Sequence, residues 1–225
     1  DVWSSITRGP SVELNDGWEY SWGDENNWRE LTDVTAGNPP NREENKILWL
    51  RSKIPTGGWQ DPVISMRYII QLGEAYIDDE LRYKNGDVEF YKKNPSALSD
   101  RGLDRQLIFL KSADLGKTLK LKIYSKREFI GIYGVVTLGS AFTTLVDLIS
   151  QEFISIFLSG AFLLLGVFSL FLFFIIPAEK GYLYLGGLAV SSAFYCIART
   201  SVKQIFIPDP LMWQNLEIFS LYLVV

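Results

Sequence analysis

The sequence predicts a protein of two parts: an all-β sandwich of jelly-roll type over residues 1–142, followed by α-helical transmembrane segments over residues 153–225. Short runs rich in Val, Ile, Tyr, Phe and Trp, separated by Gly, Asn, Asp and Pro, indicate the strands. An uncharged run of 24 residues from Phe153 to Ile176 indicates the first helix. The charges agree, because residues 153–225 hold three acidic and three basic side chains, which leaves the whole net charge of −4 before residue 153.

Strands are expected at residues 17–23, 46–53, 63–70, 74–78, 80–84, 106–111, 118–125 and 129–139. The clearest is TLKLKIYS, in which leucine and isoleucine alternate with lysine as in a half-buried strand. Asp78-Asp79 and Asn85-Gly86 supply tight turns. No helical period of comparable length precedes residue 143, so many short strands with frequent turns favour a jelly-roll sandwich.

Residues 143–152 are expected to form a short linker that begins the first helix, and three membrane segments follow at 153–176, 181–198 and 213–225. A bilayer core of ~30 Å needs about 20 helical residues. The third segment is too short for this, so we expect the natural chain to continue past Val225. Within this segment, Glu217 is an intramembrane acid and a functional candidate, with snorkelling toward the interface as the simpler explanation.

Cysteine and histidine usage limits the chemistry. The single cysteine, Cys196, lies in the second membrane segment, and the chain has no histidine. This excludes an intrachain disulfide, a cysteine zinc site, a Ser-His-Asp triad and histidine metal ligands within this sequence. No pair of carboxylates is singled out by spacing, and glycine-rich phosphate loops are absent, so we identify no catalytic residue and expect no cofactor. The acidic balance argues against nucleic acid as a partner.

Tryptophan usage suggests a ligand. Six of the seven tryptophans precede the membrane segments, and GWEYSWGDENNW places two of them beside carboxylates and amides, a mixture that suits the flat face and hydroxyls of a sugar. The candidate ligand-binding residues are Trp22, Asp24, Asn26, Trp28 and Trp59. The alternative is that tryptophans complete the core or cover the ends of the sheets. The GDENN run also offers oxygens for a structural calcium ion, but it does not match the EF-hand loop, and a solvated turn is the simpler explanation.

Three stretches carry a family resemblance: ILWLRSKIP (47–55), AYIDDELRYKNGD (75–87) and KLKIYSKREFIGIYGVVTLGS (120–140). They resemble galactose-binding-like jelly rolls, although Asp78-Asp79 stands where many relatives have Asn-Gly. The order of such a domain, a Phe- and Leu-rich first membrane segment and then YLYLGGLAVSSAFY resembles the bacterial seven-transmembrane receptors with diverse intracellular signalling modules (7TM-DISM).

The resemblance implies a multi-pass protein of the bacterial inner membrane. An extracytoplasmic β domain would bind a small ligand, often a carbohydrate, and the helices would pass the signal to an output domain beyond residue 225. The loop at 199–212 has one more basic residue than the loop at 177–181, which weakly favours the opposite orientation. A membrane-anchored glycan-active enzyme and a protein-assembly module are the alternative functions, and a homodimer is left open.

Overall fold

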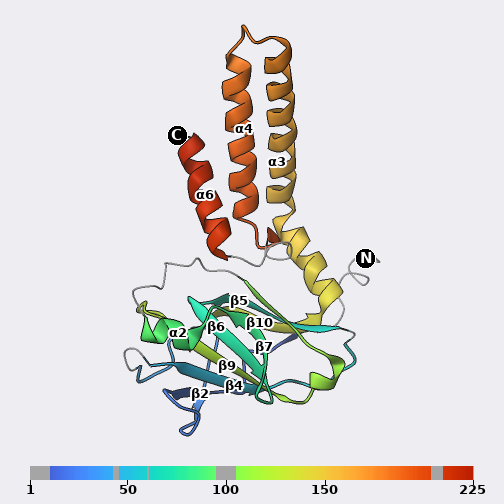
Figure 1. Ribbon diagram of the computed structural model, residues 1–225. Helices are drawn as coiled ribbons and strands as arrows, with labels where there is room; N and C mark the ends of the chain where they lie inside the picture. The colour runs from blue at the N-terminus through green and yellow to red at the C-terminus, as the bar shows by residue number, and fades with distance from the viewer. Residues whose placement is uncertain (1–10, 43–45, 60, 95–104, 204–209, 225) are drawn as a thin grey trace. The chain divides into compact units, whose positions relative to one another are not determined.

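A computed structural model describes residues 11–42, 46–59, 61–94, 105–203 and 210–224. The chain divides into two compact units, Asp1–Val146 and Asp147–Val225. The first unit is a sandwich of two antiparallel sheets (Figure 1). The predicted fold class, an all-β sandwich followed by long apolar helices, is therefore confirmed.

One sheet has four strands in the order β1-β10-β5-β8, and the other has six in the order β3-β2-β4-β9-β6-β7. Their bounds are β1 (Val12–Glu13), β2 (Trp18–Trp22), β3 (Arg29–Leu31), β4 (Leu48–Lys53), β5 (Pro62–Ile69), β6 (Leu72–Ile77), β7 (Glu80–Asn85), β8 (Gln106–Phe109), β9 (Thr118–Tyr124) and β10 (Ile132–Ser140). Each of the eight predicted strands is present, with β1 and β3 added. These two have two and three residues, too short for an alternating pattern to be visible.

The core lies between the two sheets, where alternate residues of each strand point inward. Trp18, Leu50 and Leu121 of the six-stranded sheet belong to the same buried cluster as Ile64 and Val136 of the four-stranded sheet. Each such side chain contributes about 1.5–3 kcal/mol relative to exposure to water. The lysines of β9 fall on the opposite face, as the alternation in TLKLKIYS predicts.

A short helix, α2 (Val88–Lys93), was not predicted. Asp87 caps it by accepting a hydrogen bond from the backbone N–H of Phe90 at 2.9 Å. Val88 packs against Leu72 and Tyr124 on the outer face of the six-stranded sheet, where they form a second apolar cluster. Six residues are too few to show a helical period, so the cap was the only local signal.

The predicted turn at Asp78-Asp79 joins β6 to β7. Both residues have positive φ, 44° and 71°, as a two-residue turn matching the twist of its strands requires. The Asp78 carboxylate also accepts the backbone N–H of Thr118 at 3.1 Å. The turn therefore ties the hairpin to β9.

The helices are α3 (Ala141–Ile175), α4 (Gly181–Ala198) and α6 (Pro210–Val224). α3 and α4 are long and apolar enough to cross a membrane by length and composition. α3 begins directly after β10, and residues 143–152, expected as a linker beginning the first helix, lie wholly inside it. The hydroxyl of Ser140 accepts the backbone N–H of Thr143 at 3.3 Å, a capping bond that starts this helix early.

Within the second unit, α3 and α4 approach closely where both helices have glycine. A Cβ on Gly166 would lie 3.2 Å from the Gly186 carbonyl oxygen and 3.0 Å from the backbone nitrogen of Val190. The Ser159 hydroxyl donates to the carbonyl of Ala193 at 2.9 Å. Small residues and interhelical hydrogen bonds are the usual means by which membrane helices associate.

Candidate functional site

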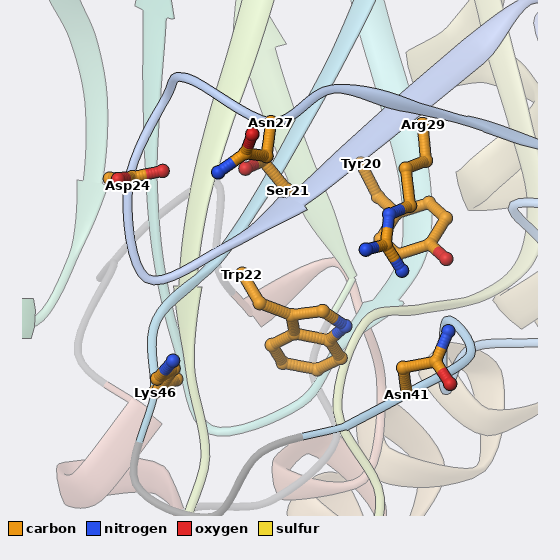
Figure 2. Close-up of a pocket in the computed structure, with 8 residues that line it drawn as sticks. All are labelled: Tyr20, Ser21, Trp22, Asp24, Asn27, Arg29, Asn41 and Lys46. Carbon is orange, nitrogen blue, oxygen red and sulfur yellow. The ribbon is translucent and has the colours of Figure 1, made fainter.

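A pocket of about 250 Å³ opens beside the end of β2 in the sandwich unit. Its lining is mostly polar and comes from β2, β3 and the segments that follow β2 and precede β4. The residues are Tyr20, Ser21, Trp22, Asp24, Asn27, Arg29, Asn41 and Lys46, and Figure 2 shows their side chains around the Trp22 ring.

The pocket exists because β3 is shorter than β2. The pairing of the two strands runs from Trp18 opposite Leu31 to Tyr20 opposite Arg29, and ends there. On the other side of β2, pairing with β4 continues to Trp22. The end of β2 is therefore held by one neighbour only, and Gly23, with φ of 86°, turns the chain away at this point.

The Trp22 side chain is fixed in this corner. Its indole N–H donates to the carbonyl of Pro40 at 2.9 Å, and its ring packs against the main core. The next turn is closed locally, because the Asp24 carboxylate accepts the backbone N–H of Asn26 at 3.2 Å and its amide at 3.1 Å. The aromatic wall is thus rigid, and the Asp24 carboxylate serves its own turn.

Several polar groups of the pocket lack partners. The Ser21 side chain is 1% exposed, and its hydroxyl has no hydrogen-bond partner among the described residues. No hydrogen bond or ion pair joins the side chains of Asn27, Arg29 or Asn41 to another described residue. The Ser21 hydroxyl is closed to solvent, so it is a buried polar group left unpaired by the fold. The side chains that the pocket presents to a ligand are those of Asn27, Arg29 and Asn41.

The predicted ligand-binding residues do not all meet here. Trp22 and Asp24 line the pocket, and Asn26 contacts it indirectly through Asp24. Trp28 lies under the guanidinium of Arg51, 4.2 Å from its carbon, and Trp59 packs against the main core. Neither of the last two lines the pocket.

The sequence analysis did not identify Tyr20, Ser21, Asn27, Arg29, Asn41 and Lys46 as lining residues. Ser21 and Arg29 look like ordinary solvent-facing strand residues in the sequence. Only the early end of β3 makes them neighbours of one cavity, so no local pattern could have selected them.

The outer face of the six-stranded sheet carries a second group of charged and aromatic side chains, but these are paired. The Lys120 ammonium lies 2.6 Å from Glu25 and 2.6 Å from Asp79, and hydrogen bonds to Asp79 and Glu25 raise its pKa. The Lys122 ammonium lies 2.6 Å from the Glu89 carboxylate. These ion pairs hold loops and α2 on the sheet. Because each of these lysines already has an acidic partner, this face is a weaker candidate for a ligand site.

Buried Glu74 anchors the other end of this network. Its carboxylate accepts the Tyr76 hydroxyl at 2.6 Å and the backbone N–H of Val88 at 3.3 Å. Burial, then the hydrogen bond to Glu74 and the nearby negative charge, raise the pKa of Tyr76. These contacts explain how α2 is docked and point to a structural role.

Two further predicted features can be located. No group of three or more acidic, cysteine or histidine side chains suited to a metal ion occurs among the described residues. Glu217 lies 3.8 Å from the guanidinium of Arg199, within the helical unit. The intramembrane candidate therefore has a cationic neighbour at the end of α4.

Comparison with known proteins gives a family match for the helical part. Residues 151–225 match the family described as 7TM diverse intracellular signalling. This match confirms the resemblance seen in the sequence and agrees with the two helices that are long and apolar enough to cross a membrane. None of the curated proteins compared with the chain matches it in sequence.

The sandwich is similar to parts of larger solved structures. A glycosyl hydrolase family 2 member from Bacteroides cellulosilyticus has 11% identity and a TM-score of 0.42 over 57% of this chain and 20% of that chain. β-Glucuronidase 3 from Bacteroides uniformis has 12% identity and a TM-score of 0.42 over 58% and 22%. β-D-Mannosidase from Dictyoglomus thermophilum has 10% identity and a TM-score of 0.41 over 59% and 23%. The chain thus spans about a fifth of the length of the structures it matches.

Proposed function

We propose, from the match of residues 151–225 to 7TM diverse intracellular signalling, that this chain is the sensor and membrane-entry region of a bacterial signalling receptor. In this proposal the sandwich lies outside the cytoplasm and binds a small polar ligand, with a carbohydrate as the leading class. The helices would cross the inner membrane several times and would pass the signal to an output domain farther along the chain.

The pocket at the end of β2 carries the proposal. Ligand sites combine an apolar wall with a few convergent polar groups, and here the Trp22 ring shares the pocket with the guanidinium of Arg29 and the amide of Asn41 (Figure 2). Pockets for drug-sized ligands measure about 300–1,000 Å³. A volume of about 250 Å³ therefore suits a small molecule such as one sugar ring.

A glycan-cleaving enzyme is less well supported. Most glycosidases place two carboxyl groups on either side of the bond they cleave. Among the described residues that line this pocket, Asp24 is the one acid, and it is engaged by Asn26. The arrangement suits binding better than hydrolysis.

Ligand binding can reach the first membrane helix through the covalent chain. β10 ends at Ser140 and α3 begins at Ala141, with no residue between them. A ligand shifts an equilibrium between two states only by its differential affinity for them. In this proposal, a ligand that favours one arrangement of the sandwich would bias the helix that continues from it.

The test uses the full chain in nanodiscs and a panel of neutral and acidic monosaccharides, with binding followed by saturation-transfer NMR. We expect at least one sugar to bind, and we expect Trp22→Ala and Asn27→Ala to weaken it about tenfold, as for loss of a packed ring or a hydrogen bond. Phe109→Ala removes an exposed aromatic from β8 of the other sheet and should leave affinity unchanged.

Trp28→Ala separates two locations for the site. Trp28 stacks with Arg51 and does not line the pocket, so its loss should leave affinity unchanged. Equal weakening by Trp28→Ala and Trp22→Ala would move the site to the outer face and overturn the pocket assignment. Absence of binding across the whole panel would overturn the carbohydrate proposal.

A further inference from the structure

The charges around the pocket favour an acidic ligand. Arg29 brings a cation to its lining and Asp24 an acid, while Lys46, which also lines the pocket, has an interaction of its own. The Asp24 carboxylate already accepts two hydrogen bonds from Asn26. Among the described lining residues, the guanidinium of Arg29 is therefore the charged group left to meet a ligand, in a chain whose net charge is −4.

Arg29 differs from the other described arginines of the sandwich. Arg51 pairs with Glu19 and stacks on Trp28, and Arg82 pairs with Glu80 and Asp114. Arg42 donates to backbone carbonyls, and Arg67 lies 5.6 Å from the Tyr68 ring. Arg105 and Arg127 also have interactions. Among the residues that the structure describes, the guanidinium of Arg29 has no such partner, and it borders a pocket.

The position of Arg29 places its guanidinium beside the aromatic wall of the pocket. It lies on β3 opposite Tyr20, and in Figure 2 it flanks the Trp22 ring together with Asn41. A guanidinium has a planar fork of donors that matches the two oxygens of a carboxylate or phosphate group. The amides of Asn27 and Asn41 remain available for the uncharged hydroxyls of the same small molecule.

We infer that the pocket selects an anionic monosaccharide, with Arg29 binding the acidic group and Trp22, Asn27 and Asn41 contacting the ring. This inference rests on the proposed function and narrows its ligand class. The shared chemistry is one acidic group on one sugar ring. A uronate carboxylate and a sugar phosphate are the two sources of that group.

The experiment compares matched sugars on the full chain in zwitterionic nanodiscs by isothermal titration calorimetry. The probes are galactose, galacturonate and galactose 6-phosphate, with glucose, glucuronate and glucose 6-phosphate as the second series. We expect an acidic sugar to bind about tenfold or more tightly than its neutral parent, the effect of one charge-assisted hydrogen bond. The preference should weaken as salt is raised, because Arg29 is exposed.

Two variants with equal changes in net charge locate the effect. Arg29→Gln should reduce the acidic preference to about threefold or less while keeping neutral-sugar binding. Arg67→Gln, at the one exposed position of β5 in the other sheet, should keep the preference intact. Tighter binding of the uronate or of the phosphate identifies the source of the acidic group and supports the inference.

The failures are distinguishable. Equal affinity for neutral and acidic sugars, or a preference that survives Arg29→Gln, overturns this inference and leaves the proposed function standing. If no sugar in either series binds, the proposed function fails together with it.

Discussion

Ser21→Ala tests whether β2, beside the pocket, carries a buried polar group that the sandwich itself does not satisfy. Ser21 lies on β2 with 1% of its surface exposed, and its hydroxyl has no hydrogen-bond partner among the described residues. A hydroxyl taken out of water without a partner costs about 1–3 kcal/mol. Alanine removes that cost and leaves a void the size of one oxygen atom, so we expect the unliganded protein to become more stable by about 1 kcal/mol.

Ser125→Ala is the matched control, because it is the same substitution at the same degree of burial. The Ser125 side chain is 3% exposed, its oxygen lies 2.9 Å from the carbonyl oxygen of Phe129, and it accepts the backbone N–H of Arg127 at 3.0 Å. Its removal deletes both of these hydrogen bonds inside the sandwich, so Ser125→Ala should destabilise it by about 1–3 kcal/mol. The two variants should therefore differ in sign.

The assay is urea and thermal unfolding of the full chain in nanodiscs, followed by tryptophan fluorescence. Six of the seven tryptophans precede residue 60, so the signal reports the sandwich. A gain of 1 kcal/mol in a domain of this size corresponds to an increase in Tm of about 3–5 °C for Ser21→Ala. A decrease in Tm similar to that of Ser125→Ala would show that the Ser21 hydroxyl is already satisfied, and would refute the argument that the sandwich leaves it unpaired.

Two other substitutions test the fold. Burial by itself raises the pKa of Asp114, but the backbone N–H of Lys111 and nearby cations hold it below the ordinary value; its stabilisation is therefore present above about pH 4 and lost as the pH falls through the lower folded-state pKa. Asp114→Asn should lower the urea midpoint at pH 7. The difference in midpoint between this variant and the unsubstituted protein should become smaller below about pH 4. A difference that does not change with pH would contradict this. Gly166→Val should destabilise the helical unit by about 1–3 kcal/mol in SDS titrations, because a Cβ there would meet Val190 at 2.6 Å. Gly160→Val, where no atom lies within 4 Å, is its control, and equal effects of the two would rule out the close helix contact.

Most of the fold could be predicted from the sequence because its signals are local. TLKLKIYS alternates because β9 has one face in the core and one outside it, and the uncharged run from Phe153 lies within a long apolar helix. The start of α3 could not be placed as well, because residues 141–152 contain charged residues and the Ser140 cap is a single contact. The short elements β3 and α2 were missed for lack of length.

The candidate site was predicted only in part, and for a different reason. Trp22 and Asp24 line the pocket, but Trp28 and Trp59, equally rich in apolar surface, do not. Composition identifies a tryptophan as a binding candidate. It does not distinguish a ring that borders an open corner from one that stacks on a neighbouring arginine.

The sequence by itself determined the two-part architecture, because alternation and hydrophobic length are properties of consecutive residues. Only the tertiary structure decided where the pocket lies. Strand β2 sits between β3 and β4, and β3 ends before β2 does, so Ser21 and Arg29 come to border one cavity. That neighbourhood depends on hydrogen-bonded pairing between separate segments of the chain, which no local pattern records.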